Sequence, residues 1–201
     1  MNMFLNIEQY TLEILRKYFG GHKWQTYRLA KKLFCNFLAT KKTKFLIPDY
    51  QRPYAWSENE CQTLWDDLFS FSFPENNYNK FDNNNEYYLG SIVTFKNNKG
   101  EMEVIDGQQR LTTLLLLLRA FYEKYKDRND DKAKQNKDEI EKCIWEKDAF
   151  KDEMDILKIE SEVATDDDKE IFLKILQDGE APTDNKSNYA ENYRFFKKKI
   201  D

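Results

Sequence analysis

The sequence predicts a mixed α/β (α+β) fold, in which a small mixed sheet is surrounded by helices and followed by a helical C-terminal part. Strand-forming residues lie on both sides of a turn over 97–100, which predicts a β-hairpin between 87 and 105. At Gly107 the period changes abruptly, and apolar side chains from Leu111 to Tyr125 then recur on one helical face. Helical periods also dominate the C-terminal part of the chain.

The other elements are predicted in chain order from the same two periods and from capping residues. Ser57 and Glu60 have the spacing of a capping box, which starts a helix. The charged span 126–139 either continues the helix that follows Gly107 or links it to the next one. The remaining elements are helices over 4–19 and 27–38, a strand over 44–47 stopped by Pro48, a helix over 140–147, a short strand over 155–159, a helix capped by Thr165 and ended by Gly179, and a last helix that carries Tyr189, Tyr193, Phe196 and Ile200.

Three parts are expected along the chain. Residues 1–43 form a basic helical segment, residues 44–126 form the core that carries the motifs, and residues 127–201 form a helical extension. The length of 201 residues suits one ordinary domain with such an appendage. Because the last helix is only just established at Asp201, we expect a further C-terminal domain in the complete protein.

The composition excludes several classes of protein. An apolar fraction of 40% supports a packed core, and the longest apolar run, Leu114–Leu118, is too short to cross a bilayer. Glu8 and Glu13 interrupt the only early apolar stretch, so we expect a cytoplasmic protein with no signal peptide and no membrane partner. Three widely spaced cysteines and a single histidine predict reduced thiols, no zinc, no haem and no histidine-based nuclease.

Charge is distributed unevenly along the sequence. The net charge is −4, yet no acidic residue lies between Ile14 and Pro48. This basic stretch either contacts nucleic acid or pairs with the acidic remainder of the chain or with a partner. If it contacts DNA, the residues expected to do so are Lys31, Lys32, Lys41 and Lys42.

The first chemical motif is Asp106-Gly107-Gln108-Gln109-Arg110, between a predicted strand and a predicted helix. Helix N-termini bind phosphate through unpaired N–H groups and a partial positive charge. Gly107 permits close backbone approach, the two glutamines offer N–H donors, and Arg110 offers a fork suited to phosphate oxygens. Asp106 either caps the helix or holds Mg²⁺. The structural alternative is a capped helix with an internal Asp106–Arg110 pair.

The second motif runs from Ile47 to Trp56, where two prolines fix an extended path. Arg52 is held stiffly between prolines and aromatic residues, which suits a phosphate-binding arginine. Tyr50 and its aromatic neighbours either stack on a base or pack as a wedge in the core. The structural alternative is a rigid connector with a structural arginine.

The third motif runs from Tyr88 to Val93 and has a glycine inside a predicted strand. Gly90 indicates a bulge, or close approach by a ligand or another backbone segment. Ser91 is expected to add a hydroxyl group to the site. Core packing is the expected role of Leu89, Ile92 and Val93.

These three motifs, in this order, resemble the DGQQR domain of GmrSD-type modification-dependent restriction endonucleases and of SspE-like phage-defence proteins. The resembling segments are I-P-x-Y-Q-R-x-Y-x-W, Y-x-L-G-S-I and V-I-D-G-Q-Q-R-L-T-T-L, and they lie between residues 44 and 125. The segment Asn192-Tyr193-x-Phe195-Phe196 is also similar to the family. The resemblance implies a ParB/sulfiredoxin-like fold and NTP binding and hydrolysis with Mg²⁺ at the DGQQR loop, coupled to DNA cleavage.

The nuclease in such proteins is usually a C-terminal His-Asn-His-type domain, so its partner here is expected to be a following domain or a separate nuclease subunit. We expect no nuclease activity from these 201 residues alone. Whether the chain is a Mg²⁺-dependent nucleoside triphosphatase is left open. The alternative is a non-catalytic DNA- or partner-binding module that grips a DNA phosphate with the same loop.

The expected site has two walls, the DGQQR loop and the Gln51-Arg52 segment. Asp106 is expected to orient Mg²⁺ or the attacking water, and Arg110 and Arg52 to neutralise charge that develops on phosphate oxygens. The full set comprises the catalytic residues Asp106, Gln109, Arg110 and Arg52 and the nucleotide- or phosphate-binding residues Gly107, Gln108, Gln51, Tyr50 and Ser91.

Overall fold

A computed structural model of the protein describes residues 38, 44–72, 74–77, 80, 89–146, 156–163 and 165–201. Four strands form a mixed sheet in the order β2-β3-β1-β6. Strand β1 (Phe45–Ile47) runs parallel to both β3 (Met102–Asp106) and β6 (Ile159–Ser161), whereas β2 (Val93–Lys96) runs antiparallel to β3. The predicted class, a small mixed sheet with helices around it, is confirmed.

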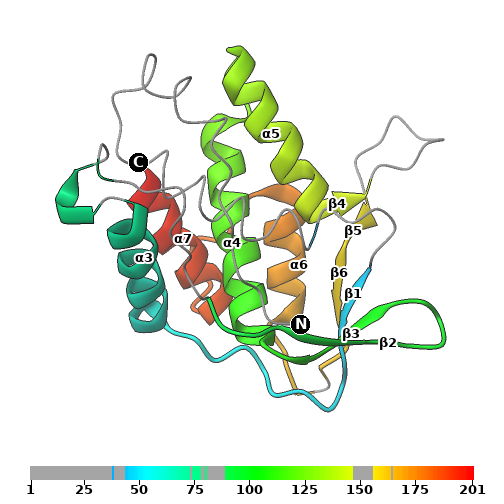
Figure 1. Cartoon of the computed structure of the whole chain (residues 1–201). Coiled ribbons are helices and arrows are strands. Elements are labelled where there is room, and N and C mark those ends of the chain that lie inside the picture. The colour runs from blue at the N-terminus through cyan, green and yellow to red at the C-terminus, as the bar shows by residue number, and fades with distance from the viewer. Residues whose placement is uncertain are drawn as a thin grey trace.

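The helices gather beside this sheet, with α4 (Gln108–Tyr125) in the middle of the group (Figure 1). Helix α4 contacts three others, α5 (Asp131–Ile144), α6 (Lys169–Asp178) and α7 (Asn188–Ile200). Helix α3 (Glu58–Ser72) packs against α7. A 3₁₀ turn, Pro74–Asn76, follows α3, and the short strands β4 (Trp145–Glu146) and β5 (Ile156–Leu157) form a second, two-stranded sheet.

Helix α4 forms the centre of the hydrophobic core. Every side chain from Leu111 to Tyr122 is buried. This differs from the predicted single apolar face, because neighbouring helices cover α4 on several sides and bury the polar positions Thr112, Thr113 and Arg119 as well. None of the described helices is long and apolar enough to cross a membrane.

Several element boundaries differ from those predicted. The strand expected over 87–95 is paired only from Val93 onward, and its first two positions lie outside the described residues. The charged span 126–139 does not continue α4. Asp130 starts α5 by accepting a hydrogen bond from the Ala133 N–H at 3.0 Å, and α5 includes the rest of the span and the first part of the helix expected over 140–147. The helix expected from Thr165 begins at Lys169. Its predicted end is correct, since Gly179 has the left-handed φ of 76°.

The prediction of three reduced thiols is wrong at Cys143, which is disulfide-bonded. Wide spacing along the sequence does not prevent cysteines from meeting in the fold, because distant segments pack together. Cys61 is a free, buried thiol at the start of α3, and burial raises its pKa to about 12.

The predicted core and the predicted extension share one sheet. Strand β6, from the extension, pairs with β1, and the register brings Phe45 opposite Ile159. The N-terminal helices expected over 4–19 and 27–37 lie outside the described residues, as do Lys31, Lys32, Lys41 and Lys42. Leu38 is buried and helical, and the end predicted there for the second helix stays a prediction, because its neighbours lie outside the described residues.

Candidate phosphate site at the start of α4

The site is built on the turn that joins β3 to α4. Asp106 is the last residue of β3, and Gly107 follows at φ 88° as the residue before the first helical position. A Cβ atom at Gly107 would lie 2.8 Å from the carbonyl oxygen of Ser91, so this position requires glycine for both backbone angle and space. The predicted change from strand to helix at Gly107 is confirmed.

No side chain among the described residues caps this helix start. Of the two roles that the sequence left open for Asp106, helix capping is therefore not observed. The first-turn N–H groups of an α-helix have no intrahelical acceptor, and they carry the partial positive end of the helix dipole. This end of α4 suits an anion.

Gln108 and Gln109 are buried, and their amide groups bind backbone. The Gln108 Nε2 donates to the Arg52 carbonyl at 2.9 Å, and the Gln109 Nε2 donates to the Pro53 carbonyl at 3.0 Å. The Gln109 Oε1 accepts the Ala55 N–H at 2.8 Å. The two glutamines thus clamp the extended segment 52–55 against the first turn of α4.

Gln51 makes the third clamp between the same two walls. Its Nε2 donates to the Ile105 carbonyl at 2.9 Å and lies 3.3 Å from the Val104 carbonyl. These carbonyls belong to the end of β3, directly before Asp106. The structure therefore brings the Gln51-Arg52 segment and the DGQQR loop together, as predicted, through glutamine-to-backbone hydrogen bonds.

Arg110 lies at the rim of the site. Its Nη1 donates to the Leu89 carbonyl at 3.3 Å, and its Nη2 lies 3.8 Å from the Asp106 carboxylate, so the predicted internal pair is present but long. A Cβ atom at Gly90 would lie 1.6 Å from Arg110 Nη1. There is close approach at Gly90, but it is made by a side chain, the guanidinium group, and not by the ligand or backbone segment that was expected.

The exposed part of the site is formed by three predicted residues. Arg52 is exposed, Tyr50 is 64% exposed, and the side chain of Asp106 is 68% exposed. Ser91 is half-buried, and its backbone oxygen faces Gly107. Within the described residues, no cluster of three or more His, Cys, Asp or Glu side chains is arranged to hold a metal ion.

With this geometry in place, the comparison with known families is informative. The sequence matches the GmrSD restriction endonuclease, N-terminal domain, over residues 34–200. The chain belongs to this family. Membership supports a role in restriction and phage defence. None of the curated proteins matches the chain.

The GmrSD match covers more of the chain than the three motifs do. It extends from before β1 to the end of α7, and so includes the helices of the predicted extension. The resemblance to the GmrSD-type domain is therefore confirmed. The similarity to ParB and sulfiredoxin stays a prediction.

A second group of residues, behind the glutamine clamps, was not predicted as part of the site. The Tyr54 hydroxyl lies 2.7 Å from Thr113 Oγ1, and the Asn192 Nδ2 donates to the Tyr54 oxygen at 2.9 Å. Burial raises the pKa of Tyr54 far above its usual value, so its hydroxyl keeps its proton. All three residues lie in segments that resemble the family, but nothing in the sequence indicated that they contact one another.

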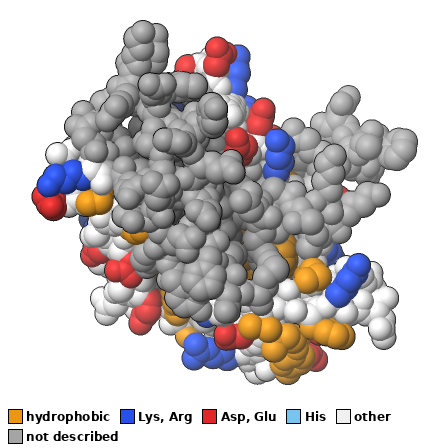
Figure 2. All heavy atoms as spheres, viewed as in Figure 1, with side chains coloured by type: hydrophobic (Ala, Val, Ile, Leu, Met, Phe, Trp, Pro, Cys, Tyr) orange, Lys and Arg blue, Asp and Glu red, His pale blue; other side chains and the backbone are white. Residues whose placement is uncertain are grey.

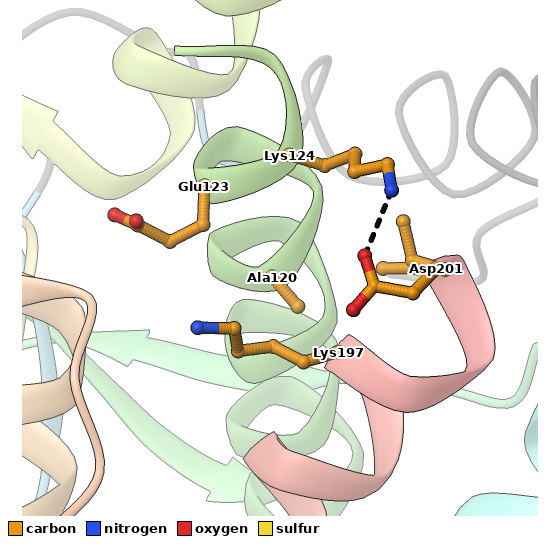
Figure 3. A pocket seen from close by; sticks show the side chains of 6 residues that line it. Ala120, Glu123, Lys124, Lys197 and Asp201 are labelled. Carbon is orange, nitrogen blue, oxygen red and sulfur yellow. Dashed lines mark hydrogen bonds and ion pairs between the residues drawn. The ribbon is translucent and has the colours of Figure 1, made fainter. Parts of the chain in front are cut away.

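The surface has two other features, one far along α4 and one beside the phosphate site, where Val93 pairs with Asp106 and is exposed, so its expected role in the core is wrong. A cavity of about 200 Å³ lies between the C-terminal ends of α4 and α7, where Lys124 Nζ binds Asp201 Oδ1 at 2.8 Å (Figure 3). Figure 2 shows hydrophobic side chains gathered over the β2–β3 region, where Val93, Phe95 and Ile105 are exposed.

Proposed function

We propose that the chain is a nucleotide-binding regulatory domain of a DNA restriction system, which binds and hydrolyses a nucleoside triphosphate at the start of α4. One observation carries the proposal: Arg110 stands on the first turn of a helix that no side chain of the described residues caps. A cation on the first turn opposes the helix dipole by about 0.3–1 kcal/mol. A bound phosphate offsets that cost and accepts the first-turn N–H groups.

The arginines supply charge to the phosphates. Both contacts of the Arg110 guanidinium are long, at 3.3 and 3.8 Å, and a guanidinium carries five N–H donors. It therefore retains donors for phosphate oxygens. Arg52 is exposed, and its carbonyl is fixed to Gln108. In the proposed reaction both arginines stabilise charge on the transferred phosphoryl group.

Asp106 fits a role at Mg²⁺. Its carboxylate is exposed at the end of β3, next to the helix start. Mg²⁺ in phosphate sites is commonly held by one or two carboxylates together with phosphate oxygens and water, so a single aspartate suffices. When bound, the metal ion would supply charge neutralisation between phosphates. The Asp106 carboxylate would hold it and orient water beside it.

The glutamines act mainly as a frame in this proposal. Gln51, Gln108 and Gln109 use their amide groups on backbone carbonyls of the opposite wall. Such hydrogen bonds fix the positions of Arg52 and Asp106 before a ligand binds, which lowers the cost of organising the site. Exposed Tyr50 is available to stack on the nucleobase.

The partner of this domain is a nuclease. Family membership supports it, since the matching family is described as the N-terminal domain of a restriction endonuclease. The nuclease is either a following domain or a separate subunit. Nucleotide hydrolysis here would regulate DNA cleavage there.

The Arg110→Ala variant tests the nucleotide site. We expect it to weaken binding of the preferred NTP by about 1.5–3 kcal/mol, or roughly 10- to 160-fold, the range for a hydrogen bond to a charged group. The free energy of unfolding should change little, because the Asp106–Arg110 pair is long and partly exposed. Calorimetric titration with each of the four NTPs and Mg²⁺ measures the affinity.

Arg128→Ala is the matched control. Arg128 is an exposed arginine beyond the other end of α4 and binds Asp130 at 3.1 Å, so its removal deletes a comparable surface pair. It should leave nucleotide affinity unchanged. If the wild-type protein binds none of the four NTPs at millimolar concentration, the proposal is wrong.

The alternative function, a non-catalytic module that grips a DNA phosphate with the same loop, is favoured by the basic stretch before Pro48. Thermal stabilisation by nucleotide supports the first function. Salt-sensitive DNA binding without nucleotide supports the second.

A further inference from the structure

We propose that Asn192 is a positioning residue of the phosphate site and that it connects the last helix, α7, to the first turn of α4. What the site binds rests on the proposed function. The connection itself rests on a chain of buried hydrogen bonds that links α7 to α4.

Asn192 lies on the second turn of α7 and is completely buried. Its Nδ2 has two acceptors, the Tyr54 hydroxyl oxygen at 2.9 Å and the Trp56 carbonyl oxygen at 2.8 Å. Both acceptors belong to the extended segment that the glutamine clamps also hold. Asn192 therefore gives the wall that carries Arg52 a further attachment, from α7.

The hydrogen bonds beyond Tyr54 have one consistent direction. Thr113 has a single hydroxyl proton, which it donates to the Gln109 carbonyl at 2.8 Å. The Tyr54 hydroxyl must therefore donate to Thr113 Oγ1, 2.7 Å away, and accept from Asn192. The chain runs from Asn192 through Tyr54 and Thr113 to Gln109, which is part of the DGQQR loop. Hydrogen bonds aligned in this way strengthen one another.

The orientation of the Asn192 amide is also determined by its surroundings. If its oxygen and nitrogen were exchanged, the oxygen would face the Trp56 carbonyl, and two acceptors would meet. In the observed orientation the Asn192 Oδ1 is buried and has no hydrogen-bond partner among the described residues. The position makes use of the Nδ2 donors, which an aspartate or a leucine does not supply.

The consequence for the site is geometric. Tyr54 also stacks on Tyr189 of α7, with ring centroids 4.6 Å apart, so α7 holds this segment by a ring and by an amide. Ala55 donates its N–H to the Gln109 Oε1 between these two anchors. Loss of the Asn192 amide should loosen Ala55, and with it the placement of Arg52 and Gln109.

The test compares Asn192→Leu with Tyr193→Phe in the 201-residue chain. Tyr193 is the next residue of the same helix, and its hydroxyl donates to the Gly179 carbonyl at 2.8 Å, away from the site. Both variants lose buried hydrogen bonds. Two quantities are measured: the exchange rate of the Ala55 amide relative to the core amide of Leu116, by NMR, and the dissociation constants of ATP and GTP with Mg²⁺, by calorimetry.

We expect Asn192→Leu to raise the relative exchange rate of Ala55 and the dissociation constant of the bound nucleotide about tenfold each, the effect of one lost hydrogen bond. Tyr193→Phe should leave both within about twofold of the wild type, a change well below that of a lost hydrogen bond. Should Asn192→Leu fail to fold, Tyr54→Phe removes the middle of the same chain and should give the same result. Equal effects in the Asn192 and Tyr193 variants overturn the proposal. If the wild type binds neither nucleotide, the proposed function fails, and the Ala55 exchange still decides the positioning role.

Discussion

The surroundings of residues 107 and 90 both favour glycine, but the atoms that would contact a Cβ differ between the two positions. A Cβ at Gly107 would meet the backbone of residues 91 and 92, whereas a Cβ at Gly90 would meet the flexible end of Arg110. The first contact cannot relax without moving the third motif. The second can relax if the guanidinium leaves its place. Both glycines also have positive φ, 88° at Gly107 and 96° at Gly90, so a side chain at either strains the backbone, and one at Gly90 also displaces Arg110.

Gly107→Ala should lower the free energy of unfolding by about 2–5 kcal/mol. About 1–2 kcal/mol comes from the left-handed backbone conformation and about 1–3 kcal/mol from overpacking against the Ser91 carbonyl. Gly100→Ala is the control, because Gly100 has nearly the same φ, 86° against 88°, and a Cβ there meets only Lys96 Cε at 4.0 Å. Urea denaturation measures both. Equal losses in the two variants would show that the contact with residue 91 does not matter.

At the residue scale, the sequence predicted which segments form the site but not the hydrogen bonds that join them. The turn at Asp106-Gly107 and the pairing of the two walls were predicted from local chemistry. The partners of Gln108 and Gln109 were not, since the acceptor carbonyls lie 56 positions earlier in the chain. Asn192 was missed as a site residue for the same reason, because its acceptors are 136 and 138 positions away.

At the element scale, the start of α3 was predicted from a local motif. The Ser57 N–H and hydroxyl both bind the Glu60 carboxylate at 2.7 Å, and the Asn59 N–H lies 3.4 Å from Ser57 Oγ. The bond from the Ser57 N–H to Glu60 is one half of the predicted capping box; in the other half, the Asn59 N–H takes the place of the Glu60 N–H. Those hydrogen bonds from Ser57 lower the pKa of Glu60 below its usual value.

Glu60→Gln should therefore remove a part of the stability that depends on pH. A carboxylate whose pKa is lowered by folding stabilises the protein above its unfolded pKa, and this contribution is lost as the pH falls through the lowered folded value. The difference in unfolding free energy between wild type and variant should be largest at neutral pH and shrink toward pH 3. Glu58→Gln, with the same charge change in the same turn, is the control. A difference that does not vary with pH would refute the role of the carboxylate.

Elements that depend on distant partners were predicted less well. The break between α4 and α5 falls where the sequence left two options open, and Asp130 decides it by capping α5. The strand predicted over 155–159 divides at Lys158 into β5 and β6, which join different sheets. Neither sheet partner is visible from local periodicity, because strand pairing depends on where other strands lie.

For the whole molecule, the packing of α7 against the buried helix α4 is the main helix contact of the fold. Helix α4 is buried along most of its length, and α7 contacts it from the site to the cavity at their C-terminal ends (Figure 3). The fold class was predictable because hairpin, turn and helical period are local features. The depth of burial of α4 was not, because it results from helices that come later in the chain.

The last prediction concerns charge over the whole molecule. If the basic stretch before Pro48 tracks a DNA backbone, the logarithm of the association constant should fall linearly with the logarithm of salt concentration, by about 0.9 per phosphate contacted. Changing Lys31, Lys32, Lys41 and Lys42 to glutamine should then reduce that slope by up to about 3.6 on duplex DNA, one contact for each lysine. Fluorescence anisotropy at several salt concentrations measures the slope. The control carries the same charge change at four exposed lysines of the described region, Lys99, Lys134, Lys142 and Lys174, and should keep the wild-type slope. An unchanged slope in the first variant means that the contact with DNA lies elsewhere. A loss of slope in both would indicate only a general effect of net charge.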